Sequence, residues 1–243
     1  MGLTTLEVDG LVYKLDYHGH DRPLAARLGE DLALELQPWR LGQHLVALDQ
    51  ALAVDRGGLA LDDAAYAAQV LAGAGEVTRW GPLALWWAAG AANEGPPQGY
   101  ALRPWTLLER ASAVRAARDP ETGRFHVGRY LSMLVACCVA RAGGGEPLAL
   151  PMCQGGPLLA AACRLCAPEP LLPAVMDDPA LRALTMRVCT ALGWSPSRVW
   201  QTPAGEIDQV LALLDRTPAS RPRPKLSALA DLPDTHTIHF EDE

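Results

Sequence analysis

The chain has 243 residues, of which 49% are hydrophobic and 20% are charged, a balance typical of a globular protein rather than a disordered one. Its formal net charge of −7 argues against a nucleic-acid-binding protein, because phosphate binding needs clustered lysine and arginine. The N-terminal segment lacks the apolar core of a signal peptide, and no apolar run approaches the roughly 20 residues of a membrane span. The bias toward alanine, leucine, glycine, proline and arginine suggests a GC-rich bacterial genome. We therefore expect the bacterial cytoplasm, where the six cysteines are free thiols.

The N-terminal segment has the pattern of a small antiparallel sheet. Residues 5–17 predict a β-hairpin, because the Asp-Gly pair at residues 9–10 supplies the positive φ of a tight turn and apolar residues alternate after it. Residues 18–29 have the pattern of a loop. Alternation returns over residues 32–36 and predicts a third strand, which ends at Pro38 because proline cannot donate a ladder hydrogen bond.

An internal repeat follows this segment. A Leu-x-Pro-Trp-x-Leu sequence occurs twice, with an offset of 66 residues. Each copy leads into a helical stretch, a loop with glycine and a second helical stretch that carries a tyrosine. We predict that residues 31–75 and 97–143 superpose as strand–helix–helix units, with Trp39 overlying Trp105. Duplicated units without a catalytic signature favour a scaffold built for contacts.

The helices of both units are predicted from apolar spacing and caps. In the first unit, one helical face is formed by Leu41, Leu45, Leu48 and Leu52. A glycine loop and an aspartate cap at residues 62–63 predict its second helix, which continues to about Ala72. In the second unit, residues 100–102 predict a short strand, and Thr106 and Glu109 predict a capping box. A helix over about residues 127–142 is expected to follow.

A tryptophan-rich stretch separates the units. Residues 77–95 predict a helix that starts at Pro82. Core packing and a role as interface anchors both stay open for its tryptophans, which are Trp80, Trp86 and Trp87.

The C-terminal third is predicted to be helical. A third, degenerate copy of the unit is considered at Leu148–Met152, with a helix over residues 157–165. Asp178 predicts the start of a further helix with an apolar face formed by Leu181, Leu184, Val188 and Leu192, before a stop at Gly193. A single helical turn is predicted to begin at Ser195-Pro196, and the last helix is predicted to begin at Thr202-Pro203.

Residues 217–233 have the composition of an extended, proline-rich tether. Residues 235–240 have β-forming side chains and predict a strand that adds to the chain's own hairpin or to the sheet edge of a partner.

The predicted fold class is α+β and mostly α-helical, with an N-terminal β-hairpin and short strands beside the repeated units. Four regions are expected, namely residues 1–76 (hairpin and unit one), 77–145 (tryptophan-rich helix and unit two), 146–216 (C-terminal helices) and 217–243 (tether and tail).

No residue constellation predicts catalysis, a cofactor or a metal. The sequence contains no nucleophile elbow and no glycine-rich phosphate loop. Cys163 and Cys166 have metal-ligand spacing, but no second pair lies at zinc-finger distance, so we interpret the cysteines as apolar core residues. The pair His18 and His20 could meet the C-terminal histidines only if the two ends of the chain meet. His44 lies mid-helix and is interpreted as structural.

Two segments resemble proteins of contractile tails. The strand–Pro-Trp–helix units at residues 36–41 and 102–107 resemble the L-R-P-W-T-x-x-E starts of small T4-type baseplate and tail-assembly proteins of contractile phage tails and related injection systems. Residues 192–214 resemble the C-terminal helical motif of phage tail assembly chaperones, in which a Gly-Trp-Ser/Thr-Pro turn precedes two helices. The first unit departs from the pattern, because Arg40 and Gln43 replace the capping pair.

The resemblance implies a non-enzymatic structural or assembly component that binds baseplate, spike or tail-tube proteins, in the bacterial cytoplasm or within an assembled tail-like particle. A permanent component and a transient chaperone both stay open. The alternatives are a stand-alone α-helical adaptor of unrelated origin and an enzyme with an unrecognised site. The candidate partner-binding residues are Trp39, Trp105, Trp200, Ile238 and Phe240.

Overall fold

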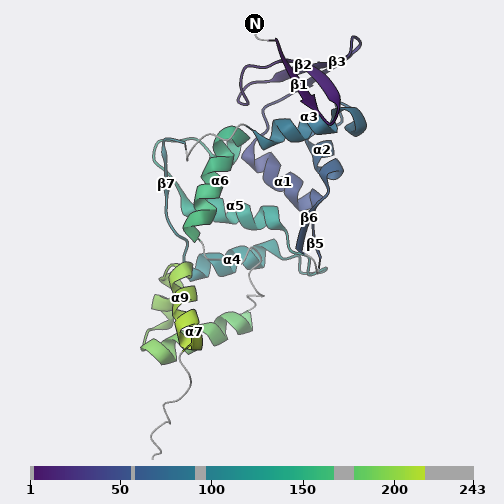
Figure 1. The fold of residues 1–243 in the computed structure, drawn as a ribbon. Coiled ribbons are helices and arrows are strands. Elements are labelled where there is room, and N and C mark those ends of the chain that lie inside the picture. The colour runs from purple at the N-terminus through teal and green to yellow at the C-terminus, as the bar shows by residue number, and fades with distance from the viewer. Residues whose placement is uncertain (1–2, 56–57, 91–96, 167–177, 217–243) are drawn as a thin grey trace, which may run out of the picture.

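In a computed structural model, the chain is described at residues 3–55, 58–90, 97–166 and 178–216. These residues form the predicted α+β, mostly helical fold, with nine α-helices, one short 3-10 helix and a four-stranded antiparallel sheet. The elements follow a long axis, with the sheet at one end and the C-terminal helices at the other (Figure 1). Within the described residues, the helices are too short or too polar to cross a membrane.

The N-terminal sheet contains four strands that pair in chain order, β1 (Leu3–Val8), β2 (Leu11–Asp16), β3 (Leu24–Leu28) and β4 (Leu32–Leu36). The predicted hairpin is confirmed, and it turns at Asp9 and Gly10, both at positive φ. The predicted loop over residues 18–29 is wrong, because β3 lies inside it. Residues of β3 do alternate between buried and exposed, but its two alanines have a weak strand propensity that hides the pattern.

The first unit continues from β4 into α1 (Leu41–Ala51), β5 (Leu52–Asp55), β6 (Gly58–Leu61) and α2 (Asp63–Leu71). The predicted cap of the second helix is confirmed, because the Asp62 carboxylate accepts a hydrogen bond from the Ala65 amide at 2.9 Å. Strands β5 and β6 pair antiparallel on either side of the predicted glycine loop, whose residues 56–57 lie outside the described residues. Leu52 therefore belongs to a strand rather than to the helix, since its extended backbone starts the ladder.

The tryptophan-rich helix α3 spans Val77–Ala89 and packs against α2. The prediction that it starts at Pro82 is wrong, because the helix begins more than one turn earlier. Pro82 is the sixth residue of this helix, so it removes one intrahelical hydrogen bond, and the burial of Trp80, Leu83 and Trp87 stabilises the helix around it.

The second unit contains β7 (Tyr100–Leu102), α4 (Leu107–Ala117) and α5 (Val127–Cys138), followed by β8 (Val139–Arg141). The capping box is confirmed, since the Glu109 carboxylate accepts from the Thr106 amide at 2.8 Å and the Thr106 hydroxyl accepts from the Glu109 amide at 3.2 Å. The predicted helix up to residue 142 ends earlier, because residues 139–141 pair with β7 and that ladder satisfies their backbone groups.

The C-terminal third contains the 3-10 helix η1 (Pro147–Ala149), α6 (Met152–Cys166), α7 (Asp178–Leu192), α8 (Pro196–Gln201) and α9 (Ala204–Arg216). The predicted helix starts at Asp178, Ser195-Pro196 and Thr202-Pro203 and the stop at Gly193 are confirmed. The helix predicted from residue 157 instead begins at Met152, so Pro157 lies inside it. Leu192 does not belong to the apolar face, since it is 40% exposed at the end of α7. The segment considered as a third copy has a 3-10 turn where the units have a strand.

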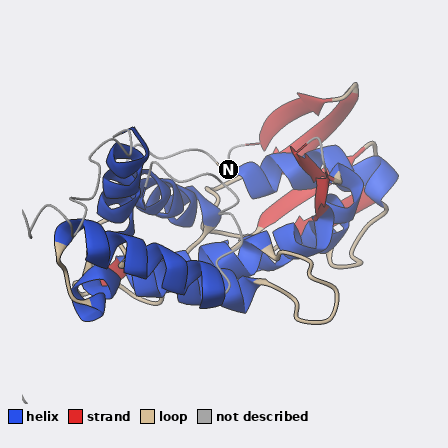
Figure 2. Cartoon of the chain, turned by 90° about the horizontal axis from the view of Figure 1, so that it is seen from below, coloured by secondary structure: helices blue, strands red, loops and turns tan. Residues whose placement is uncertain are grey.

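Three hydrophobic clusters lie one after another along the molecule. The first joins the inner face of the sheet to α2 and α3, the second joins α1 to α4, α5 and α6, and the third joins α4 to α7, α8 and α9. Figure 2 shows the four-stranded sheet at one end and the helices over the rest. Packing therefore crosses the predicted boundary before residue 77, because α3 belongs with the sheet.

Candidate functional site

Both repeat units contain the same aromatic pair. Trp39 and Tyr66 lie edge to face with ring centroids 6.3 Å apart, and Trp105 and Tyr130 lie edge to face at 5.4 Å. The helices that follow these tryptophans, α1 and α4, have equal lengths and the offset of 66 residues found in the sequence. The two tryptophans thus have related environments, as the predicted duplication requires.

A later segment completes the first unit. The Leu41 amide donates to the Leu150 carbonyl at 2.9 Å, and the Met152 amide donates to the Trp39 carbonyl at 2.8 Å. These bonds form an antiparallel bridge on both sides of Pro151, directly before α6. We call α6 the closing helix of unit one, since it packs across the start of α1.

The second unit is completed in the same way. The Leu107 amide donates to the Thr202 carbonyl at 3.0 Å, and the Ala204 amide donates to the Trp105 carbonyl at 3.0 Å. This bridge surrounds Pro203, directly before α9, which is the closing helix of unit two. Each structural unit therefore extends beyond the segment that the sequence repeat predicts.

The tryptophans of the units are core residues rather than exposed anchors. Trp39 is 8% exposed and Trp105 is 1% exposed, which corrects their interpretation as partner-binding residues. The free edge of Trp39 lines a small hollow of about 310 Å³ beside Val46. Trp200 is 37% exposed, and its indole donates to the Thr185 hydroxyl at 3.0 Å. Two further candidates lie outside the described residues, namely Ile238 and Phe240.

A hydrogen-bonded chain of three side chains joins the start of α1 to α2. The Trp39 indole donates to the Tyr66 hydroxyl at 3.1 Å, and that hydroxyl lies 2.6 Å from Nδ1 of His44. Burial raises the pKa of Tyr66 and lowers the pKa of His44 to about 4, so both groups are neutral near pH 7. Tyr66 and His44 are therefore joined by a hydrogen bond between neutral groups, whose direction depends on the tautomer of the ring, and this supports the structural interpretation of the histidine.

The low pKa of His44 predicts an acid-sensitive fold. Because the folded pKa lies below the ordinary value of 6.5, the unfolded chain binds the proton more readily. The stabilisation is complete above pH 6.5 and is lost as the pH falls toward 4. We expect the free energy of unfolding to drop by about 2 kcal/mol between pH 7 and pH 5 through this group.

Urea unfolding at both pH values measures that drop. His44→Gln can still accept from Tyr66 but cannot titrate, so its pH dependence should be flatter by about the same 2 kcal/mol. An equal pH dependence of wild type and variant would contradict the assignment.

An ion pair takes the corresponding place in unit two. Arg110 lies 66 residues after His44 and is only 4% exposed. Its two terminal nitrogens donate to the Asp208 carboxylate at 2.5 and 2.7 Å. This two-pronged geometry is strong and directional, and it fastens the closing helix α9 to α4.

The tryptophans of α3 mostly face the core. Trp80 and Trp87 are buried under the sheet, which supports the core-packing alternative for them. The ring of His20 stacks on Trp87 at a centroid distance of 4.7 Å, and burial lowers the pKa of His20. His18 instead lies at the exposed end of β2, where its Nε2 is 3.0 Å from the Asp16 carboxylate. The two histidines therefore do not converge, and the C-terminal histidines lie outside the described residues.

The cysteines occupy buried, half-buried and exposed positions. Cys138 and Cys166 are buried with their sulfurs 3.5 Å apart, and this hydrogen bond together with burial raises the pKa of Cys138. Cys163 is exposed, so its interpretation as a core residue is wrong. Among the described residues, no three or more His, Cys, Asp or Glu side chains are grouped as a metal site.

The outer face of the N-terminal sheet is a feature that the sequence did not single out. A hollow of about 750 Å³ lies over β2, β3 and β4, and the exposed side chains that line it are Lys14, Asp16, Ala25, Arg27, Ala33 and Glu35. We call these six residues the sheet face. The small alanines make the hollow, and the four charged side chains stand around them.

Comparisons with protein-family models, with curated proteins and with solved structures each found no match to this chain.

Proposed function

We propose that this chain is a non-enzymatic assembly component of a contractile phage tail or a phage-tail-like injection system. The observation that carries the proposal is the contact between the two segments with the sequence resemblance. The backbone at Trp105 pairs with the backbone on both sides of Pro203, so that the Pro-Trp start of α4 and the start of α9 form one unit. Two motifs that resemble tail proteins separately are therefore neighbours in space.

The buried polar side chains form contacts that hold helices together, which supports a binding role. His44 holds two helices of unit one together, and Arg110 holds α4 to the closing helix of unit two. Both groups have structural partners at short distance. This arrangement is expected of a scaffold that presents surfaces to other proteins.

The C-terminal helices carry exposed apolar side chains that fit such a role. Met186 is 60% exposed, Leu213 is 62% exposed and Trp200 is 37% exposed. Aromatic side chains that are half open at the surface are frequent anchors of protein interfaces. Among the residues that the structure describes, Trp200 therefore remains the candidate anchor. The proposed partners are baseplate, spike or tail-tube proteins.

Co-expression tests this proposal. The tagged chain is produced in a bacterium together with candidate baseplate, spike or tail-tube proteins, one at a time. We expect one of them to co-elute with the chain in size-exclusion chromatography, and Trp200→Ala to lower the recovered partner by about 10-fold or more.

The control for that variant is its circular dichroism spectrum, which should match the wild-type spectrum. Failure of all these tail proteins to co-elute would contradict the proposal. Stable capture of an unrelated bacterial protein in their place would favour the adaptor alternative.

A further inference from the structure

The strand register sorts the sheet face into two rows of side chains. Lys14 on β2 lies opposite Arg27 on β3, which in turn lies opposite Ala33 on β4. We call this line the basic row. One pleat further along the strands, the acidic row contains Asp16, Ala25 and Glu35, which are also directly opposite one another.

Neither Lys14 nor Arg27 has a residue of opposite charge directly opposite it on a neighbouring strand. Lys14 and Arg27 are direct cross-strand neighbours, and like charges in this position are destabilising. Neither side chain has an ion-pair partner in the part of the chain that the structure describes. The acidic row is close by, but its carboxylates already contact His18 and Gln37. A partner that places negative charge over the basic row would remove the repulsion.

We propose that the sheet face binds the sheet face of a second copy of this chain through a two-fold axis. The axis lies between the two sheets, runs across the strands and passes midway between the two rows. A rotation by 180° about it places the acidic row of each copy over the basic row of the other. Asp16 then lies opposite Lys14 of the second copy, and Glu35 lies beside Arg27 of the second copy.

Side-chain size is complementary in the same arrangement. Arg27 lies over Ala25 of the second copy, and Glu35 lies over Ala33 of the second copy. Each long side chain thus faces an alanine, and the hollow of about 750 Å³ provides the room. An isologous interface needs a surface that is complementary to itself, and these two rows meet that condition in both charge and size.

The extent of the face sets the expected strength. Three strands about 4.8 Å apart and five residues at about 3.4 Å each cover only roughly 250 Å². Stable interfaces bury about 800 Å² per partner, so this dimer is weak and forms at high protein concentration. Since the contacts are ionic and partly exposed, the association weakens with salt. The inference is independent of the proposed role in tails.

Sedimentation velocity of the full chain tests the proposal at roughly 10 to 500 µM protein and at about 0.05 M and 0.5 M salt. We expect a monomer–dimer equilibrium that shifts to dimer with concentration and back to monomer with salt. Lys14→Glu places like charges opposite each other in both symmetry-related pairs, so the dissociation constant should rise by about 10-fold or more.

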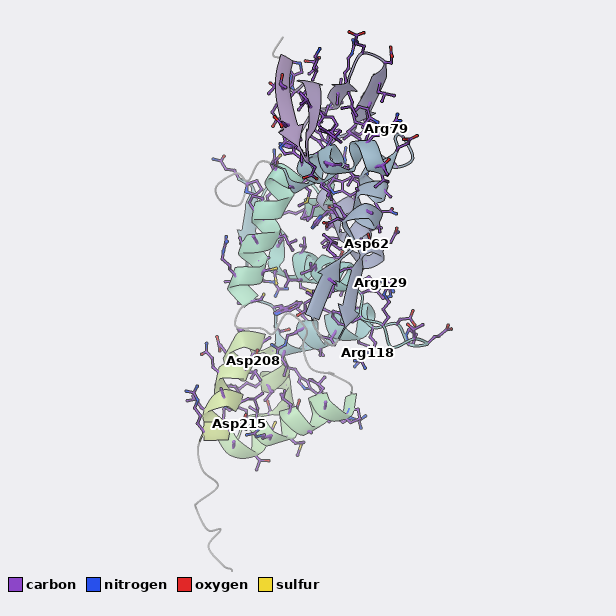
Figure 3. The ribbon with its side chains drawn as sticks, turned by 45° about the vertical axis from the view of Figure 1, so that its right-hand side comes forward. Asp62, Arg79, Arg118, Arg129, Asp208 and Asp215 are labelled. Atoms are coloured by element: carbon purple, nitrogen blue, oxygen red, sulfur yellow. The ribbon has the colours of Figure 1, made fainter. Side chains whose placement is uncertain are left out.

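Two further variants make the result specific. Arg129→Glu changes the net charge by the same amount on α5, away from the sheet (Figure 3), and should leave dimerisation unchanged. The variant with all four charges reversed, K14E/D16K/R27E/E35R, keeps the pattern and should dimerise with itself but not with the wild type. The proposal would be overturned if the wild type stayed monomeric or if Lys14→Glu left the dissociation constant unchanged. It would also be overturned if the quadruple variant formed dimers with the wild type.

Discussion

Gly128→Ala should destabilise the protein by about 3 kcal/mol or more, although alanine is normally the better residue inside a helix. Helix α5 crosses α1 so closely at this point that an alanine Cβ would overlap the carbonyl oxygen of Leu45. The Asp49 carboxylate also accepts hydrogen bonds from the amides of Gly128 and Arg129, at 2.6 and 3.1 Å. Separating the helices would break this cap and open the contact between the two repeat units.

Urea unfolding measures this loss, and Gly156→Ala is the matched control. Gly156 also lies inside a helix, and apart from its chain neighbours its added Cβ would meet only the end of the Met152 side chain, at an ordinary 3.4 Å. That variant should change the free energy of unfolding by no more than about 1 kcal/mol, because the better helix propensity of alanine offsets the crowding of its Cβ by the ring of Pro157. If both glycine variants had similar stability, the close crossing of α1 and α5 would be refuted.

Asp208→Ala should destabilise the protein by about 3 kcal/mol. The substitution leaves the buried guanidinium of Arg110 without the carboxylate that accepts two hydrogen bonds from it. Losing one partner of a buried ion pair costs far more than the pair itself contributes, because the remaining charge stays desolvated. We expect the closing helix α9 to loosen first, which hydrogen exchange of its amides would detect.

An exposed pair on the same helix is the control for Asp208. Arg187 on α7 pairs with Asp215 near the end of α9, and both side chains are about half exposed. Figure 3 shows Asp208 nearer to α4 and Asp215 nearer to the other end of α9. Asp215→Ala should change the free energy of unfolding by less than about 1 kcal/mol. Equal effects of the two substitutions would mean that Arg110 is not held by Asp208.

The sequence predicted elements wherever local chemistry decides the structure. The Asp-Gly turn at residues 9–10, the cap at Asp62 and the capping box at Thr106 all depend on neighbouring residues, and all three were confirmed. Strand β8 depends on pairing with the distant strand β7, and it was missed. Val139 continues a helical apolar pattern, and it becomes part of a strand only because β7 lies beside it.

The candidate site was harder to predict for a related reason. A tryptophan in a repeated motif fits both a core and an interface, and only the packing shows that Trp39 and Trp105 are buried. The sheet face could not be found without β3, whose Ala25 and Arg27 lie between the residues of β2 and β4. Residue spacing along one strand does not reveal rows of charge that run across several strands.

The positions of the closing helices in the chain also constrain how the protein folds during synthesis. Unit one comprises residues 32–71 and 147–166, while unit two comprises residues 100–138 and 196–216, so the two are interleaved along the chain. During synthesis, the first unit lacks its last helix until the leading helices of the second have already emerged. The units therefore cannot mature one after the other, and no single cut separates them.

This order also constrains the history of the gene. A tandem copy of one complete unit would have placed α6 ahead of β7, directly after the helices that it closes. The observed order is therefore not that of a tandem duplication of one complete unit.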